Sequence, residues 1–536
     1  MPLKKPIIFI VGTILVLCSF TGCIFDQIFG GTSFNLISWS VTDDDGFPGI
    51  LFNFTTDGRV TLDMDNPHSN LDDYDFFYSN SEAILHLEEY KKTVNPGSYQ
   101  LKVYDKDSKE VFSQSFDFNG PNLHILSCSQ YWWEYDDVCA LIGLKLKVQN
   151  LGDIPGYPYA VSVTIDDEEH PGLVLPSVIM PGEYDDVYCV LYKKGSPTNN
   201  TINVELKDKE GNILDSNSYN VDKTPFFTTY TYTGGLSSKL VIPYPLFLYN
   251  YYSELQRIYE EDYSVYVFDQ YEDYYIELLI DLLIDTNPLG IIGYNAKSDS
   301  EKVNFVASFV QNLEYKKDSE TDDSYEYPRY PIETLFSYGC GAGDCEDKAI
   351  LTACLLDHLG FNVALFRLTN HMAVGVKFED TTLPGYSCYA SGYYYLETTT
   401  PGKPVGFIPS DYRNPDELTV YPVYSRPYLL HNWVNDVVTI YTNTELGDFV
   451  KVLAIVENHG NATANNIMIE GVFYRSSSGV DIKSNTATVT SLESWMKKKV
   501  VLTVDIPKGY DTEFKTNLYF NGEIVGEPKV SSSTFS

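Results

Sequence analysis

Alternating apolar and polar positions dominate the first part of the chain and predict short β-strands. Residues 37–41 and 98–104 alternate in this way, and turn-forming pairs such as Pro96–Gly97 separate the runs. A period of two places successive side chains on opposite faces of a strand, so one face of each strand can pack on a core. The pattern therefore predicts a β-sandwich over residues 33–120.

A second alternating segment, residues 121–222, is similar to the end of the chain, residues 429–536. In each, an apolar strand ends in Val-x-Asn-x-Gly, at Val148–Gly152 and at Val456–Gly460. Because Asn and Gly tolerate positive φ, we expect each motif to form a tight turn between strands. The pair resembles the immunoglobulin-like modules of exported archaeal and bacterial proteins. This resemblance implies two β-sandwiches that act as spacers or as platforms for a cell-surface partner.

Between these β segments, over residues 223–428, the periodicity becomes helical. Ser298–Glu301 matches a capping box, and apolar residues then recur every three or four positions. Asp344 is a good N-cap and Gly360 a good C-terminal stop for a further helix. Apolar strands follow that helix, and the last of them ends at Glu397. We predict a multidomain protein with an α+β core flanked by all-β domains.

The first residues are typical of an export signal. Two lysines precede an apolar run, residues 7–17, that is too short to span a bilayer comfortably. Small and polar residues then lead to Phe20–Cys23, which resembles the lipobox of lipoproteins and implies lipidation at Cys23. The alternatives are an uncleaved anchor or an ordinary signal peptide. All three place the protein outside the cytoplasm, and we expect residues 1–32 to tether it to the cell membrane.

Composition and cysteine spacing narrow the classes of function. The formal net charge of −37 repels phosphate backbones and argues against nucleic-acid binding. The chain has no Cys-x-x-Cys pair, so we expect no structural zinc, and we predict no other metal and no cofactor. Disulfides are permitted outside the cell. A hairpin bridge between Cys128 and Cys139 is one hypothesis, and a bridge between Cys340 and Cys388 is another.

Cys345 stands where a nucleophile is expected. A glycine-rich approach ends at Asp344, so Cys345 falls in the first turn of the predicted helix. The positive end of a helix dipole favours thiolate over thiol, and the free N–H groups there can bind a developing oxyanion. His371 opens a later strand and can take the thiol proton. Glu397, at the end of the next strand, can orient the imidazole.

These residues and their order resemble the transglutaminase-like superfamily, whose core is related to that of papain-type cysteine proteases. Four segments carry the resemblance, in the order that the family has them: Phe309–Tyr315, Gly343–Ala349, Asn370–Val374 and Tyr395–Thr399. The resemblance implies a papain-like catalytic domain. It also implies that Cys345, His371 and Glu397 form a catalytic triad.

Two features depart from the family pattern. Glu397 stands where most members have Asp, a shorter side chain with the same charge. Animal transglutaminases use a Trp to help stabilise the oxyanion, but no Trp lies between Trp133 and Trp433 in this chain. Gln311 and Tyr338 are the two candidates for that role.

The resemblance implies acyl transfer through a thioester. Cys345 would attack a peptide or glutamine amide of a protein substrate, and water or an amine would then resolve the thioester. We favour peptide hydrolysis, because cross-linking needs access for an amine and exclusion of water. The alternative is a catalytically inactive surface protein whose β domains bind a partner. A third hypothesis is dependence on calcium, for which the acidic residues 318–326 are a candidate site.

Overall fold

The computed structural model describes residues 32–535, except 69–71, 136–137, 224–228, 233–238, 260, 287–296, 321–325, 340, 379–382, 384–388, 435–437 and 445–446. The predicted export signal with Cys23 lies outside the described residues. So do Cys340 and Cys388, and with them the bridge considered between these two residues. Among the helices of the described residues, none has the length and apolar character needed to cross a membrane.

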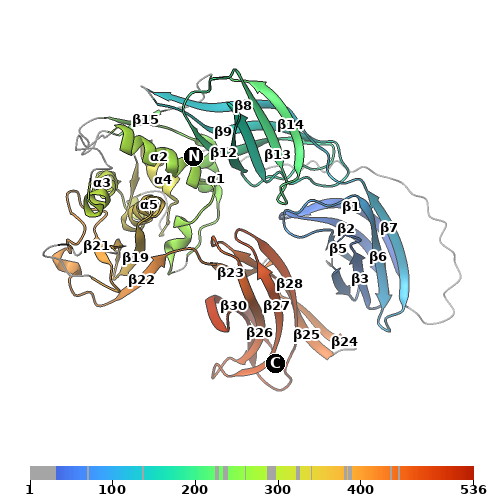
Figure 1. Ribbon diagram of the computed structural model, residues 1–536. Helices are drawn as coiled ribbons and strands as arrows, with labels where there is room; N and C mark the ends of the chain where they lie inside the picture. The colour runs from blue at the N-terminus through green and yellow to red at the C-terminus, as the bar shows by residue number, and fades with distance from the viewer. Residues whose placement is uncertain are drawn as a thin grey trace.

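The protein is multidomain and mostly β, with several antiparallel sheets and one helical region (Figure 1). Two sheets make up the first β domain, and their apolar faces pack against each other. The three-stranded sheet contains β1 (Phe34–Asp44), β2 (Phe47–Thr56) and β5 (Ser81–His86). The four-stranded sheet contains β4 (Asp72–Phe77), β3 (Val60–Asp65), β6 (Gly97–Asp105) and β7 (Glu110–Phe118). Apolar side chains from both sheets, among them Phe52 and Leu101, form one buried cluster.

The second β domain is one seven-stranded sheet around its own core. Its strands are β8 (Leu123–Tyr135), β9 (Val138–Asn150), β10 (Ala160–Ile165), β11 (Glu168–Val174), β12 (Tyr184–Lys194), β13 (Thr201–Lys207) and β14 (Ile213–Asn220). This differs from the predicted two-sheet sandwich, because β11 pairs with both β10 and β12 and joins the halves. The sheet curls until its edges meet, where the Gln130 amide donates to the Asn220 carbonyl at 2.8 Å.

The predicted bridge between Cys128 and Cys139 is wrong, since both residues are free thiols. Within the β8–β9 hairpin, Cys128 pairs with Leu146, whereas Cys139 pairs with Glu134. The hairpin is longer than the spacing of the two cysteines suggested. Its register therefore holds the two sulfur atoms several residue pairs apart along the ladder.

The last β domain consists of two four-stranded sheets. One contains β23 (Leu429–Trp433), β24 (Thr439–Thr444), β25 (Gly447–Asn458) and β28 (Lys497–Asp505). The other contains β26 (Ala464–Arg475), β27 (Asp481–Leu492), β29 (Thr512–Phe520) and β30 (Glu523–Phe535). Buried side chains from both sheets, such as Val452 and Phe473, form a single core.

The internal repeat seen in the sequence is also a repeat of contacts. Asn150 is fully buried, and its side-chain carbonyl accepts hydrogen bonds from the backbone amides of Asn122 and Gly152. Asn458 does the same with Tyr428 and Gly460. Both Asn amides also donate to buried backbone carbonyls. Each asparagine side chain thus joins the first residues of its domain to the turn that follows the asparagine.

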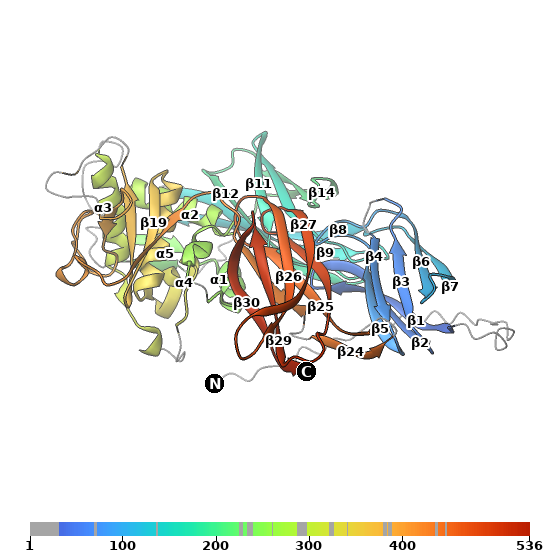
Figure 2. The ribbon, with the colours of Figure 1, turned by 90° about the horizontal axis from the view of Figure 1, so that it is seen from below.

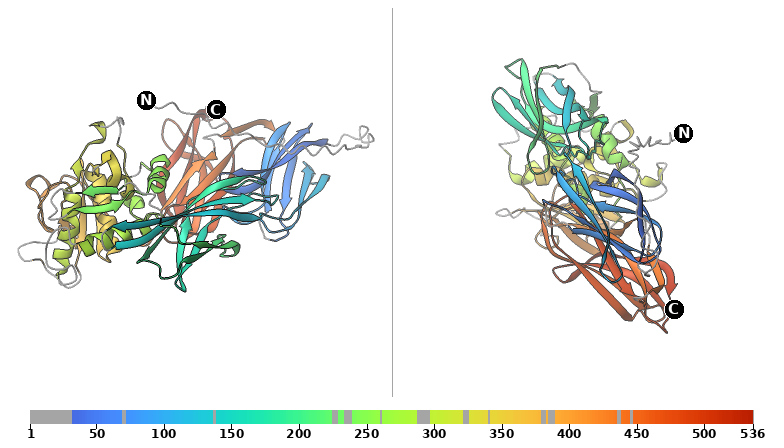
Figure 3. Two further views of the ribbon diagram at one scale, coloured as in Figure 1. Left: turned by 90° about the horizontal axis from the view of Figure 1, so that it is seen from above. Right: turned by 90° about the vertical axis from the view of Figure 1, so that its right-hand side faces the viewer.

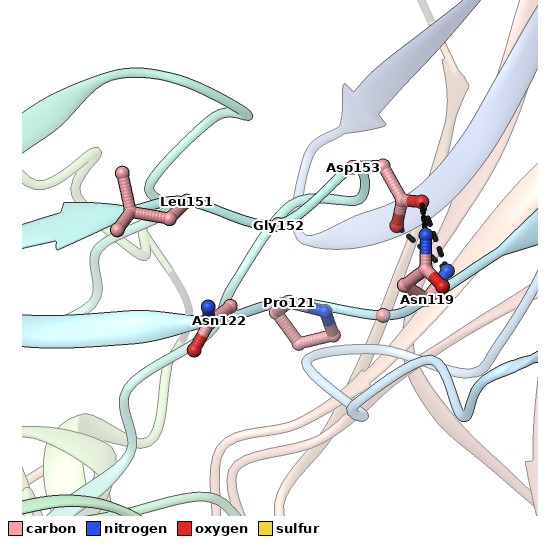
Figure 4. A pocket seen from close by; sticks show the side chains of 7 residues that line it. Asn119, Pro121, Asn122, Leu151, Gly152 and Asp153 are labelled. Carbon is pink, nitrogen blue, oxygen red and sulfur yellow. Dashed lines mark hydrogen bonds between the residues drawn. The ribbon is translucent and has the colours of Figure 1, made fainter.

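The reason for the glycines differs from the expectation. Neither Gly152 nor Gly460 has a positive φ. A Cβ on Gly152 would lie 2.3 Å from the carbonyl oxygen of Gly120, and one on Gly460 would lie 2.2 Å from that of Arg426. Close approach of two backbones, not turn conformation, therefore requires glycine here. Figure 4 shows the first of these crossings, where the Asp153 carboxylate accepts hydrogen bonds from Asn119.

The helical region contains the predicted site. Its elements are β15 (Thr229–Tyr232), β16 (Leu240–Pro243), α1 (Leu246–Glu254), η1 (Tyr263–Val267), α2 (Asp273–Thr286), α3 (Asp299–Gln311), β17 (Glu314–Tyr315), η3 (Asp318–Glu320), α4 (Pro331–Phe336), η4 (Ser337–Gly339), β18 (Ala342–Gly343), α5 (Cys345–His358), β19 (Asn362–Leu368), β20 (His371–Lys377), β21 (Tyr394–Leu396), η5 (Ser410–Tyr412) and β22 (Leu418–Val423). The sheet order is β21-β20-β19-β22. Helix α5 contacts β19 and β20 of this sheet as well as α2, α3 and α4. The helix is therefore enclosed on several sides.

The last β domain lies between the helical region and the first β domain (Figures 2 and 3). Lysines of β28 form ion pairs with acidic residues of the first domain, among them Lys498 with Glu89 at 2.8 Å. Lys499 is paired with Asp44. The first and last β domains are thus in contact, although they are far apart in sequence.

Candidate active site

The start of helix α5 fixes the position of Cys345. The predicted N-cap Asp344 is confirmed, and a capping box joins it to Asp347. Asp347 is fully buried and accepts hydrogen bonds from the Arg329 guanidinium at 2.6 Å and from the Arg329 backbone amide at 2.8 Å. This ion pair holds the first turn in place. Cys345 is the first residue of the helix and is partly exposed.

The electrostatic setting of Cys345 is the reverse of the one expected from its helix position. Burial and the neighbouring carboxyls of Glu346 and Asp344 raise the pKa of the Cys345 thiol well above its ordinary value. The thiol donates a hydrogen bond to Glu346 at 3.2 Å. The helix dipole favours a thiolate, whereas desolvation and the two neighbouring carboxyls favour the thiol. The resting nucleophile is therefore a thiol that needs a base.

His371 lies at the start of the strand that approaches this thiol. Strand β20 begins at His371, after a turn in which Asn370 has a φ of 55°. The backbone of the following residue, Met372, lies close enough to the Cys345 sulfur to favour its thiolate form. The ring of Tyr412 stacks on the imidazole, with centroids 4.4 Å apart and planes at 7°. One face of the imidazole is thus covered by a tyrosine ring.

Glu397 follows the end of β21 and is almost completely buried. One of its oxygens accepts hydrogen bonds from the Thr399 amide, at 2.8 Å, and from the Thr399 hydroxyl. The other oxygen lies 3.6 Å from Nε2 of His371. Burial alone would raise the pKa of Glu397, but the contacts with His371 and Thr399 outweigh it and lower the pKa to about 2. Glu397 is therefore a carboxylate facing the imidazole.

The structure contradicts Gln311 as an oxyanion donor. Its side-chain nitrogen donates to the carbonyls of Glu397 at 2.7 Å and Lys403 at 2.8 Å. Its side-chain oxygen accepts from the Gly402 amide at 3.0 Å. Both N–H groups are used, so none is left for a substrate oxygen. Gln311 instead holds the loop that follows Glu397.

Tyr338, the other oxyanion candidate, has the setting of a surface residue. Its ring is 49% exposed, and the Lys316 ammonium lies 4.1 Å from the ring centroid. Its backbone has a φ of 54°. No contact described here joins its hydroxyl to the thiol, so its role stays a prediction.

Three residues of the site were missed by sequence reasoning. Tyr412 stacks on His371 from a later segment, and nothing local in the sequence signals this contact. Tyr395 lies beside both His371 and Glu397, and its place two residues before Glu397 on a strand was an available signal. Lys348 is fully buried and donates to the Leu313 carbonyl at 2.9 Å. Burial lowers the pKa of Lys348 to about 8, against the opposing charge of Glu397.

A second Cys, His and Asp grouping lies on the other end of helix α5. Nδ1 of His358 is 2.9 Å from the Cys354 carbonyl oxygen, and Nε2 is 3.1 Å from Asp273. Cys354 is buried at 1% exposure, and burial raises the pKa of its thiol to about 11. A buried, protonated thiol of this kind is inert.

The described residues contain one grouping of side chains with ligand atoms close enough to hold a cation: those of Asp344, Cys345 and Glu346 lie within 4.8 Å of one another. An ion bound by all three would occupy the sulfur, so we treat the group as part of the acid–base setting of the thiol. The calcium hypothesis for residues 318–326 falls partly outside the described residues. Within that stretch, Asp318 is already paired with Arg329 at 2.8 Å.

Comparisons with known proteins add no family. No protein-family model matches the chain, and no curated protein matches it. A solved structure of the YadV chaperone aligns with 35% of this chain and 99% of its own, at 7% identity and a TM-score of 0.13. A β-glucuronidase of glycoside hydrolase family 2 aligns with 92% of this chain and 75% of its own, at 9% identity and a TM-score of 0.15. Likenesses at such TM-scores carry no argument about activity.

Proposed function

We propose that the chain is a transglutaminase-like cysteine enzyme that cleaves or transfers acyl groups of peptide or glutamine amides through a thioester. The observation that carries the proposal is the placement of one thiol, Cys345, at the start of an enclosed helix and beside the first residues of the strand that His371 opens. The His371 imidazole in turn faces the Glu397 carboxylate. These placements support a nucleophile, a base and an orienting acid that act in sequence.

In this proposal, His371 removes the thiol proton as the sulfur attacks the amide carbonyl carbon. The electron pair of the carbonyl moves onto oxygen, where backbone N–H groups of the first turn of α5 can stabilise it. Collapse of this intermediate expels the amine, which takes the proton from the imidazolium and leaves a thioester on Cys345. Water resolves the thioester in a peptidase, and a second amine resolves it in a cross-linking enzyme. We favour water as the group that resolves the thioester, because the N-terminal sequence predicts an exported, membrane-tethered protein and cross-linking would require the exclusion of water.

An inactive surface protein that binds a partner through its β domains is the second candidate. The raised pKa of the Cys345 thiol favours it, because an unassisted thiol is a poor nucleophile at neutral pH. The two candidates differ in whether His371 assists the sulfur.

Alkylation with iodoacetamide tests the proposal. We expect Cys345 to be labelled near neutral pH at least tenfold faster than the buried Cys354, and His371→Ala to slow the labelling of Cys345 by at least tenfold. Peptide mass mapping after timed quenching measures both rates in one sample. Equal, slow labelling of the two cysteines in the unaltered protein would favour the inactive surface protein.

A further inference from the structure

The hydroxyl of Tyr395 lies between the imidazole and the carboxylate of the proposed triad. It is 2.9 Å from Oε2 of Glu397 and 3.3 Å from Nε2 of His371. The direct distance from Nε2 to Oε2 is 3.6 Å, longer than a normal hydrogen bond. The nearest oxygen to Nε2 among these is therefore that of Tyr395, not that of Glu397.

Hydrogen-bond accounting gives each atom a role. Glu397 is ionised and can only accept, so the single O–H of Tyr395 points to Glu397. The lone pairs of the Tyr395 oxygen are then free to accept a hydrogen bond from Nε2–H of His371. A proton on Nε2 leaves the lone pair of Nδ1 to receive the thiol proton. The tyrosine thus selects the tautomer that the reaction needs.

Packing fixes the hydroxyl in this position. Tyr395 is fully buried, and burial together with the charge of Glu397 raises the pKa of its hydroxyl far above the ordinary value. Strand β21 pairs Tyr395 with Gly375 of β20, the strand that carries His371. The ring of Tyr389 packs edge-on against it, with centroids 5.4 Å apart. The group is therefore a neutral hydroxyl that cannot turn away.

The other oxygen of Glu397 explains why the carboxylate does not reach His371 directly. Thr399 holds Oε1 through its amide and its hydroxyl. Gln311 holds the backbone carbonyl of Glu397. Both ends of the residue are fixed, and the space that remains between Oε2 and Nε2 is bridged by the hydroxyl.

We propose that Tyr395 is a positioning residue that links Glu397 to His371, so that the working unit is Cys345, His371, Tyr395 and Glu397. The inference rests on the proposed function, since it concerns the same nucleophile.

The pH profile of Cys345 alkylation tests this link without any substrate. Tyr395→Phe removes only the bridging oxygen, and we expect it to slow alkylation at pH 7 by about tenfold and to move the profile to higher pH, because the imidazolium loses its acceptor. Tyr393→Phe is the matched control. Tyr393 lies two residues before Tyr395, and its hydroxyl donates to Asn362 at 2.8 Å. The control should keep the unaltered profile, and thermal melting confirms that both variants are folded.

A double-mutant cycle identifies the route. Glu397→Gln alone should slow alkylation by about a hundredfold, but only by about tenfold when Tyr395 is already Phe, because both changes break one chain of contacts and the double variant is no slower than Glu397→Gln alone. Additive effects, or a Tyr395→Phe profile equal to that of Tyr393→Phe, would overturn the link alone. Failure of His371→Ala to slow alkylation would instead refute the proposed enzyme and the link together.

Discussion

At Cys345 two electrostatic effects oppose each other. The first turn of a helix stabilises a thiolate by at most about 2 kcal/mol. Burial and two adjacent carboxyls act in the opposite direction and raise the pKa of the Cys345 thiol. Position on a helix was visible in the sequence, but the degree of burial and the distance to Glu346 were not. A proton acceptor is therefore more important here than the helix position suggested.

This balance predicts how the pH dependence changes when the base is lost. With His371→Ala, the reactive species is the small thiolate fraction of a thiol whose pKa is raised. As long as the pH is below the pKa, the thiolate fraction increases about tenfold for each unit by which the pH rises. The alkylation rate should therefore rise steadily from pH 7 to 9. The unaltered protein should respond less steeply, because His371 accepts the proton. Parallel slopes for the two proteins would show that His371 does not act as the base.

Gln311 provides a second prediction. Gln311→Met keeps the volume but removes three hydrogen bonds and leaves one buried and one partly buried backbone carbonyl without this donor. We expect a loss of roughly 2–4 kcal/mol in the free energy of unfolding. Alkylation of Cys345 should slow as well, since the loop after Glu397 is released.

The neighbouring residue is the control for this change. The Asn312 side chain donates to the Ser308 carbonyl, within its own helix and away from the Glu397 loop. Asn312→Ala should cost no more than about 1 kcal/mol and leave alkylation unchanged. Denaturant unfolding followed by mass mapping compares both variants. If Gln311→Met unfolds less readily than Asn312→Ala, Gln311 does not hold the loop.

At the scale of elements, local patterns predicted much and tertiary contacts decided the rest. Capping residues marked the starts of α3 and α5, and alternation marked the strands, because both are local properties. The helical periodicity predicted within residues 223–428 did not show where the helices before Ser298 begin and end. The structure has two helices there, separated by the short η1, whose first turn is capped by Asp262. The Asn-x-Gly motif was found from sequence, but its purpose depends on a backbone that crosses from another segment.

That crossing gives a prediction for Gly460. A Cβ at this position would lie 2.2 Å from a backbone oxygen that cannot move freely. Gly460→Ala should therefore destabilise the last β domain by about 2–4 kcal/mol, by strain alone. Asn461→Ala is the milder comparison, because it removes one exposed hydrogen bond to the Arg426 amide and should cost about 1 kcal/mol or less. Thermal unfolding of the two variants distinguishes close approach from an ordinary turn, for which both changes would be equally small.

His431 makes the stability of the same domain depend on pH. It lies on β23 with Nε2 3.0 Å from the Thr516 hydroxyl, and burial lowers its pKa from 6.5 to about 4. The unfolded chain then binds more protons than the folded one between pH 6.5 and 4. Stability from this group is complete above pH 6.5 and declines as the pH falls, by about 2 kcal/mol at pH 5. Denaturant unfolding at pH 7 and pH 5 should show this loss, and His431→Gln should abolish it.

At the scale of the whole molecule, the order of domains was predictable and their contacts were not. Changes of periodicity along the chain separated the β segments from the helical one. Nothing in the sequence around Asp44 or Lys499 indicates that these two residues form an ion pair. The contact depends on how the domains pack against one another. The sequence predicted β domains that act as spacers or as binding platforms and indicated no contact between them. In the structure, the first and last β domains contact each other.

The contact between Lys499 and Asp44 predicts how the ends of the molecule separate. The Lys499 side chain is only 6% exposed, and Nε2 of His86 lies 2.9 Å from the same carboxylate. Burial would raise the pKa of Asp44, but His86 and Lys499 lower it to about 2, so the cluster stays charged down to strongly acidic pH. Lys499→Met leaves a half-buried carboxylate and should weaken the contact by about 1–3 kcal/mol. Hydrogen exchange in β5 and β28 should then increase together.

Lys498 is the matched comparison for this experiment. Lys498 lies on the same strand as Lys499, β28, and pairs with Glu89 of the first β domain. Both of these side chains are more than 30% exposed, so solvent and salt screen the pair. Lys498→Met should change exchange little. Adding Asp44→Asn to Lys499→Met should restore part of the protection, because it removes the unpaired charge. If Lys499→Met and Lys498→Met have the same small effect, the two domains are joined by their apolar contacts and the buried ion pair is dispensable.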